Sequence, residues 1–233
     1  MQIKQFNHFY QLLPSPRFFP VNSYLVQEDD GLTLIDTGMA AGAQKLIQAI
    51  QGLEQPLRRI LVTHFHYDHT GGLDTLCEQW PDISFCFSAR DTRILDGDLS
   101  LDPSEPKTEI KVKPPQVKAR PDRYIKDGDK IGSLEVIATP GHTPGSLSYY
   151  DPRSKTVFVG DALQVAGGVA VAGDTRLLFP FPALATWDKP TAVQSAKRLL
   201  DFEIEILASG HGLLASGSQQ MLSRAVGRAE RKQ

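Results

Sequence analysis

The sequence is poor in cysteine and contains no long apolar segment. Its 233 residues include two cysteines, Cys77 and Cys86, which excludes a fold held together by a disulfide framework. We expect both to be small buried side chains. No run approaches the roughly 20 apolar residues of a membrane-spanning helix, and the N-terminus lacks the apolar region of a secretory signal. We therefore expect a cytoplasmic protein without a membrane segment.

An excess of basic charge is also absent. The formal net charge is −2, which argues against general affinity for nucleic acids, so no nucleic-acid partner is expected. Charge is uneven locally, because residues 91–105 are mainly acidic and residues 107–126 are mainly basic. We interpret these stretches as a solvated surface whose halves neutralise each other. The alternative is a basic rim that attracts an anionic substrate.

The length and composition fit one large domain or two small ones, since 41% of the residues are hydrophobic and 22% are charged. Residues 96–123 differ from the rest, because they contain five prolines and lack sustained periodicity. We interpret them as a long insertion and not as a linker between independent domains. The prediction is a single domain over residues 1–233 with a surface insertion near residues 96–123.

Short apolar runs predict strands on both sides of this insertion, and longer periodic segments predict helices. The expected strands are residues 22–26, 32–35, 59–62, 84–87, 134–138, 146–150, 156–159 and 204–208, and the expected helices are 40–53, 73–78, 191–200 and 221–231. Two strand-rich halves with helices indicate an α/β sandwich with helices on its outer faces. Sites lie at strand ends in such sheets, so we expect one along a sheet edge.

Five of the six histidines lie in motifs flanked by glycine, and His8 is the exception. Residues 63–72 read THFHYDHTGG, His142 lies in GHTPG, Asp161 follows a glycine, and His211 lies in GHG. Imidazole and carboxylate are ligands that zinc and similar metals prefer. A single histidine in an apolar run is usually a core residue. The joint pattern predicts a two-metal site instead.

Local geometry supports this prediction. His64 and His66 are two residues apart, so extended backbone points both side chains the same way. Asp68 and His69 come after the chain has begun to turn, so they can address a second metal. A glycine precedes each of the other candidate ligands and lets the backbone approach the metals closely.

The motifs resemble those of the metallo-β-lactamase-fold hydrolase superfamily. The order of the family is present: Asp36-Thr37-Gly38 after the second expected strand, then H-x-H-x-D-H, G-H-T-P-G, G-D and G-H-G. The resemblance covers nearly the whole chain and is specific for fold and metal site, but weak for substrate. It implies a four-layer αβ/βα sandwich of two mixed β-sheets with helices on the outer faces.

The resemblance also implies the ligands. One metal ion would be held by His64, His66 and His142, the other by Asp68, His69 and His211, and Asp161 would bridge them. We expect two Zn²⁺ ions per chain, with Mn²⁺, Fe²⁺ or Co²⁺ as alternatives. A hydroxide between the ions would be the nucleophile, and Asp68 would orient it as the catalytic side chain. Asp36 would support a ligand imidazole or the motif loop by hydrogen bonding.

The implied function is a dinuclear metal-dependent hydrolase that attacks the carbonyl of a small ester, thioester, lactone or amide. A phosphodiesterase or nuclease, a mononuclear iron persulfide dioxygenase and a non-catalytic sensor are the alternatives. Asp161 departs from the antibiotic-hydrolysing group that uses cysteine there, and His66 replaces the glutamate of the diiron flavoproteins. Gln164 stands where acyl-homoserine lactonases have tyrosine. The C-terminal helical region of glyoxalase II has no clear counterpart after His211.

The segment 164–187 is apolar, rich in glycine and proline, and directly follows Asp161. It predicts a wall or lid over the site, so the expected partner is a small molecule with an apolar portion. Core packing or a homodimer contact is an equally weighted alternative. The candidate pocket residues are Tyr67, Gln164, Phe179 and Phe181, with Phe18 and Phe19 nearby.

Overall fold

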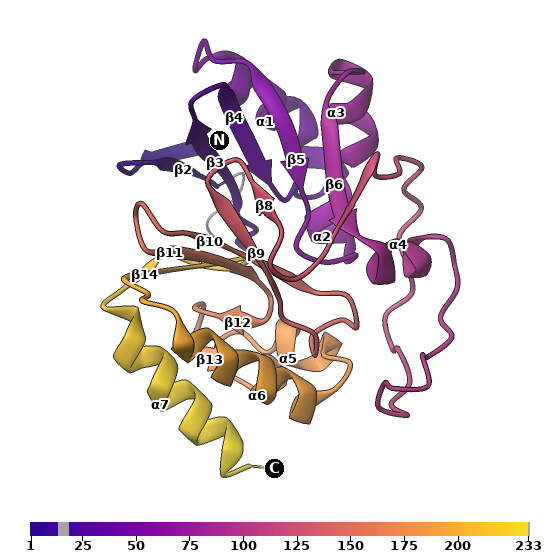
Figure 1. Ribbon diagram of the computed structural model, residues 1–233, viewed down its shortest axis with the longest axis vertical. Coiled ribbons are helices and arrows are strands. Elements are labelled where there is room, and N and C mark those ends of the chain that lie inside the picture. The colour runs from indigo at the N-terminus through magenta and orange to yellow at the C-terminus, as the bar shows by residue number, and fades with distance from the viewer. Residues whose placement is uncertain (14–18, 233) are drawn as a thin grey trace.

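Two mixed β-sheets lie face to face, and helices cover the outer face of each (Figure 1). The computed structural model describes residues 1–13 and 19–232, so Phe18, named above for the site wall, lies outside the described residues. This architecture confirms the expected α/β class and its four-layer sandwich. Within the described residues, no helix has the length and apolarity needed to cross a membrane.

The first half of the chain builds a seven-stranded sheet whose strands follow one another in sequence order. They are β1 (Gln2–Gln5), β2 (Phe9–Leu13), β3 (Ser23–Glu28), β4 (Gly31–Ile35), β5 (Leu57–Leu61), β6 (Ser84–Ser88) and β7 (Arg123–Ile125). Strands β1 to β4 pair antiparallel, and β4 to β7 pair parallel. The helical segments of this half are η1 (Ala40–Gly42), α1 (Ala43–Gln51), α2 (Tyr67–Thr70), α3 (Leu73–Gln79) and α4 (Ala89–Leu95).

The second half builds a six-stranded sheet in the order β15-β14-β11-β10-β9-β8. Its strands are β8 (Lys130–Ile131), β9 (Leu134–Ala138), β10 (Leu147–Asp151), β11 (Thr156–Gly160), β14 (Ile206–Ser209) and β15 (Ala215–Ser216). A separate hairpin joins β12 (Leu163–Gln164) and β13 (Ala170–Val171). The helices are α5 (Phe181–Ala185), α6 (Lys189–Arg198), η2 (Leu199–Asp201) and α7 (Ser218–Glu230).

Three hydrophobic clusters fill the three interfaces between the four layers. Phe9, Tyr149 and Phe158 pack between the sheets. A second cluster joins the first sheet to α1 and α3, and a third joins the second sheet to α6 and α7. Because both faces of the central strands are covered, β2, β4, β10 and β11 are buried at every position. Cys86 is buried as expected, whereas Cys77 is only partly buried.

Several elements were not expected from the pattern of the sequence. Strand β2 is buried along its whole length, so it lacks the alternation that marks a half-exposed strand. Helix α4 overlaps the acidic stretch 91–105, for which we expect a solvated surface. Its start is marked by Ser88, whose side chain accepts a hydrogen bond from the Asp91 amide. Helix α5 has only five residues, too few for a helical period to show.

The insertion has no helix or strand from residue 98 to residue 122, yet it is not only a solvated surface. Ile110 and Val117 are buried in the cluster that covers the first sheet. Two α4 arginines, Arg90 and Arg93, pair with its acidic residues. Among the described ion pairs, the one formed by the basic stretch joins Arg120 to Asp96. Mutual neutralisation of the two halves is therefore only a small part of the charge balance.

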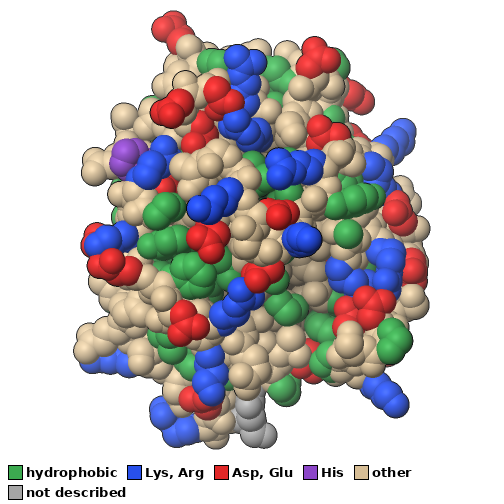
Figure 2. Space-filling model, in the orientation of Figure 1, with side chains coloured by type: hydrophobic (Ala, Val, Ile, Leu, Met, Phe, Trp, Pro, Cys, Tyr) green, Lys and Arg blue, Asp and Glu red, His purple; other side chains and the backbone are tan. Residues whose placement is uncertain are grey.

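The surface carries both signs of charge without separation on the face that Figure 2 shows, where Lys and Arg side chains lie among Asp and Glu side chains. This mixture agrees with the small net charge of −2. A single-sign field of the kind that attracts nucleic acids is not evident on this face.

Tyr149 offers a test of how the two sheets are joined. It is fully buried in β10, and its hydroxyl donates to the carbonyl oxygen of Val62, directly after β5, at 2.6 Å. We predict that Tyr149→Phe lowers the free energy of unfolding by about 1–3 kcal/mol, because it removes the donor to a buried carbonyl. Urea denaturation measures this. Tyr124→Phe, at a side chain that is 60% exposed, is the control, and equal stability of both variants would contradict the prediction.

Candidate metal centre

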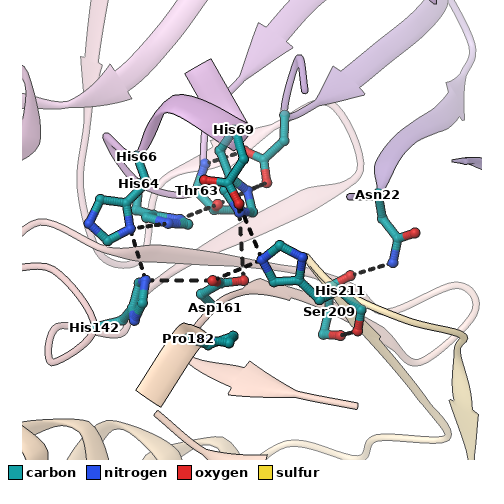
Figure 3. Close-up of polar contacts among 12 residues, drawn as sticks. Asn22, Thr63, His64, His66, His69, His142, Asp161, Pro182, Ser209 and His211 are labelled. Carbon is teal, nitrogen blue, oxygen red and sulfur yellow. Dashed lines mark hydrogen bonds and ion pairs between the residues drawn. The ribbon is translucent and has the colours of Figure 1, made fainter. Parts of the chain in front are cut away.

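Strand ends from both sheets meet at one edge of the sandwich and carry the candidate ligands. The parallel strands β4 and β5 end just before Asp36 and the first histidine motif. In the second sheet, β9, β11 and β14 run in one direction and end near His142, Asp161 and His211. Figure 3 shows the histidines and Asp161 converging from these elements. Asp68 and His69 come from α2.

The first group of ligand atoms comes from His64, His66 and His142. The His66 Nδ1 atom lies 3.1 Å from His64 Nε2 and 3.0 Å from His142 Nε2. All three side chains are buried. Their nitrogens lie close enough together to hold one metal ion.

The second group comes from Asp68, His69 and His211, and Asp161 touches both groups. Asp68 Oδ2 lies 3.3 Å from His211 Nε2 and 3.7 Å from His69 Nε2. Asp161 Oδ2 lies 3.2 Å from His211 Nε2 and 3.6 Å from His142 Nε2, and its Oδ1 lies 3.6 Å from His69 Nε2. The structure thus brings all seven predicted ligands together, with Asp161 between the two groups.

Hydrogen bonds on the outside of the cluster determine which imidazole nitrogen faces inward. The Nδ1 atoms of His69 and His211 lie 2.7 Å from Asp36 Oδ2 and from the Pro20 carbonyl oxygen. Both partners only accept, so each Nδ1 must donate, which leaves Nε2 as the inward atom that can bind a metal ion or a second proton. The same assignment holds for His64, because its neighbour Thr63 already donates its hydroxyl hydrogen to Asp36.

When the imidazoles are neutral, the inward atoms are therefore acceptors that face acceptors. Among the described residues, His69 Nε2 and Asp161 Oδ1 are buried side-chain atoms without a hydrogen-bond partner. Leaving buried polar atoms unpaired costs free energy, and a proton or a cation between them removes the cost. Nitrogen and oxygen donors of this kind suit zinc and related divalent metals. The residues present consequently fit a metal centre.

The pKa values in the cluster fall into two classes. Burial lowers the pKa of His66 to about 3 and that of His142 to about 4, so both are neutral at pH 7, as metal binding requires. Burial also acts on His69, but the carboxylates of Asp36, Asp68 and Asp161 outweigh it and raise its pKa to about 9. His69 thus binds a proton that a metal ion would displace.

Asp36 and two glycines shape the loops behind the ligands. Asp36 has a φ of 60°, a conformation unfavourable for a residue other than glycine. It accepts hydrogen bonds from the Thr63 amide at 2.8 Å and hydroxyl at 2.9 Å, besides the one from His69. A Cβ atom at Gly160 would lie 2.4 Å from Thr63 Oγ1, and one at Gly210 would lie 2.5 Å from Asp161 Oδ1. Only glycine permits these approaches.

Asn22 supports the His211 loop, and no motif of the sequence points to it. Its side-chain amide donates to the carbonyl oxygens of Ser209 at 2.9 Å and Gly212 at 2.7 Å, and Figure 3 shows the first of these bonds. Its backbone amide donates to Gly210. The sequence shows only a polar residue directly before strand β3, which does not reveal these distant partners.

A cleft of about 310 Å³ opens onto the cluster. Its apolar wall comes from four separate segments, represented by Phe19, Met39, Val112 and Phe181. Val112 belongs to the insertion, so the insertion contributes to the site. Tyr67 also lines the cleft and is half-exposed.

The other two pocket candidates lie behind this wall. Phe179 is buried, with its ring centroid 5.1 Å from that of His211. Gln164 is also buried, and its side-chain amide donates to the Phe179 carbonyl oxygen at 3.0 Å. Tyr67 and Phe181 therefore face the cleft, whereas Gln164 and Phe179 support it.

Two relatives match this chain over nearly their whole length. It is 43% identical over 232 residues to YobT of Bacillus subtilis (strain 168), which covers 99% of this chain and 100% of that protein. It is 28% identical over 221 residues to hydroxyacylglutathione hydrolase GloC of Haemophilus influenzae, which covers 91% of this chain and 95% of that protein.

Solved structures share its fold. A metallo-beta-lactamase from Pontibacter korlensis superposes with a TM-score of 0.74 at 19% identity, over 98% of each chain. The structure of TTHA1623 in a di-iron-bound form superposes with a TM-score of 0.65 at 27% identity, over 92% of this chain and 98% of that one. A sequence model of the metallo-beta-lactamase superfamily matches residues 16–211. The chain therefore belongs to the metallo-beta-lactamase superfamily.

Proposed function

We propose that this protein is a dinuclear metal-dependent hydrolase of a small ester, thioester, lactone or amide, with a thioester as the first substrate to test. The observation that carries the proposal is the convergence of seven candidate metal-ligand side chains beneath a cleft with an apolar wall. The name of GloC, hydroxyacylglutathione hydrolase, favours the thioester, because the similarity covers 95% of that relative.

The chain's own residues divide the work. His64, His66 and His142 would hold one ion, Asp68, His69 and His211 the other, and Asp161, which contacts both groups, would be shared. When bound, two divalent ions would lower the pKa of a water molecule toward 7 and, offset by only two carboxylates, favour developing negative charge on the substrate.

Asp68 is the side chain proposed to orient the attacking water. Its carboxylate lines the cleft and is 20% exposed. Burial would raise the pKa of Asp68, but His69 and His211 outweigh it and lower the pKa to about 2. An ionised carboxylate at that place can accept a hydrogen bond from a water molecule. The oxygen of this water would then point toward the substrate. The apolar wall would bind the acyl portion and exclude bulk water.

Phosphodiester hydrolysis is the second candidate, because Lys111 and Lys113 are exposed on either side of Val112, which lines the cleft. Replacing both lysines by alanine should cripple turnover of bis-p-nitrophenyl phosphate if the substrate is a phosphodiester. The same change should leave a thioesterase nearly unaffected. Metal analysis separates both from the persulfide dioxygenase, which would hold one iron per chain.

We predict that zinc stabilises the metal-stripped protein and that two ions bind per chain. At a free zinc concentration about 100 times the Kd, each site adds about 2.7 kcal/mol to the free energy of unfolding. Calorimetric titration and thermal unfolding measure both quantities. His8→Ala, which changes the histidine outside the cluster, should behave as wild type, and His69→Ala should lose at least one ion. Equal zinc binding by these two variants would reject the ligand assignment.

For the reaction, we predict that Asp161→Asn lowers kcat/KM for the best thioester at least about 100-fold, because it removes the carboxylate that both ligand groups contact. Steady-state kinetics on metal-loaded protein measures the loss. Circular dichroism verifies that the variant is folded. Near-normal turnover by the folded variant would refute the proposed site.

We predict that Phe181→Ala raises KM for substrates with long apolar acyl chains about tenfold and changes kcat little. The ring lines the cleft, and its described ring pairs are with Phe19 and Phe179 and not with a candidate ligand. Leu184→Ala, at an exposed position of the same helix α5, is the matched control. An effect that is the same for short and long acyl chains would speak against an acyl-binding wall. Phe179→Ala is less selective, since that ring packs on His211.

A further inference from the structure

Asp91 is a buried carboxylate that the proposed reaction does not use. Its side chain lies in α4 and is 0% exposed, and no described ion pair within 4 Å involves it. Burying an unpaired carboxylate costs free energy unless hydrogen bonds compensate. The location of those bonds therefore indicates what Asp91 does.

Within residues 1–13 and 19–232, the hydrogen bonds to the Asp91 carboxylate all come from the two loops that carry the first ligand group. Oδ2 accepts from the Phe65 amide at 3.0 Å and from the Thr143 hydroxyl at 2.7 Å. Oδ1 accepts from the Gly145 amide at 2.7 Å. Phe65 lies between His64 and His66, and Thr143 directly follows His142. One carboxylate thus joins the first histidine motif to the second.

Gly145 makes this junction possible. A Cβ atom at this position would lie 2.5 Å from the Asp91 amide nitrogen and 2.6 Å from both Asp91 Oδ1 and Ser88 Oγ. Such contacts are far inside van der Waals distance, so only glycine lets the second loop reach the carboxylate. This close approach explains why the last position of the G-H-T-P-G motif is glycine in this chain.

Helix capping does not explain the carboxylate. Ser88 caps α4 by accepting from the Asp91 amide at 3.3 Å, and in a capping box the side chain three positions after the cap bonds back to the cap amide. Here the carboxylate bonds to the ligand loops instead. Strand β6, which precedes α4, is parallel to β5, so its end delivers Asp91 to the same edge as the histidine motif.

The second ligand group is held by other residues. Asp36 holds His69, and the Pro20 carbonyl oxygen holds His211. Asp91 forms no described hydrogen bond to the segments of Asp161 or His211. A substitution at Asp91 should consequently displace the first ligand group more than the second.

We propose that Asp91 is a positioning residue that holds His64 and His66 in register with His142, and so determines the affinity of the first ligand group for its ion. The inference rests on the proposed two-ion centre. In Asp91→Asn, the side-chain NH₂ would face at least one N–H or O–H that now donates to a carboxylate oxygen. That donor would lose its acceptor, and one loop would lose its link to the other.

The test is zinc titration of the metal-free full-length protein, followed by calorimetry and by the absorption spectrum of the cobalt-substituted form. Asp91→Asn should weaken the binding of one of the two ions about 10- to 100-fold. The affinity for the other ion should stay within about twofold of wild type. The matched control is Asp151→Asn, a change at another fully buried carboxylate, which should bind both ions as wild type does.

A second measurement does not depend on metal. Amide hydrogen exchange at Phe65 and Gly145 in the metal-free protein should be faster in Asp91→Asn than in wild type, and unchanged in Asp151→Asn. If Asp91→Asn fails to fold, Thr143→Val, which removes only one of the three donors, should weaken the same ion by a smaller factor.

The outcomes separate the two proposals. A wild-type protein that binds two ions, together with an Asp91→Asn variant that binds both normally, would overturn the role of Asp91 and leave the proposed function standing. An equal loss of affinity for both ions would also overturn the role of Asp91, because such a result would indicate a general loss of structure. A wild-type protein that binds no divalent ion would overturn the proposed function, and the role of Asp91 toward an ion with it.

Discussion

The structure depends on one electrostatic constraint, the gathering of hydrogen-bond acceptors that face one another in the protein interior. His69 Nε2 and Asp161 Oδ1 are buried without partners, and the remaining inward atoms lie 3.0–3.7 Å apart. Such a cluster is costly unless positive charge enters it. The surrounding structure keeps these acceptors close together. The strand ends fix the backbone, and Asp36 and Pro20 bind the outer nitrogens of His69 and His211.

Each proposed ion would draw ligands from both sheets. His64 and His66 follow a strand of the first sheet, whereas His142 follows a strand of the second, and the other group divides in the same way. The site therefore exists only when the sheets are packed, and ion binding would stabilise that packing. Tyr149 and Asp91 connect the two halves next to the ligands.

The sequence is sufficient to predict the α/β class and to assign the candidate ligands to one site. These signals are local, because each ligand motif follows a short apolar run. Asn22, Asp91 and Val112 could not be found this way. Their importance comes from contacts with residues far along the chain, such as Gly212 for Asn22 and Gly145 for Asp91. A local pattern contains no information on such pairings. For the same reason, the composition of the insertion predicts only a surface segment, although Val112 lines the cleft.

The wall of the cleft has a different origin from its floor. Phe19, Met39, Val112 and Phe181 come from segments that supply none of the seven candidate ligands. Mutations in these segments could alter the shape of the cleft while the donor atoms keep their positions. Evolution could thus exchange one preferred substrate for another without passing through an inactive intermediate. Such separation of chemistry from selectivity would let one scaffold serve many reactions.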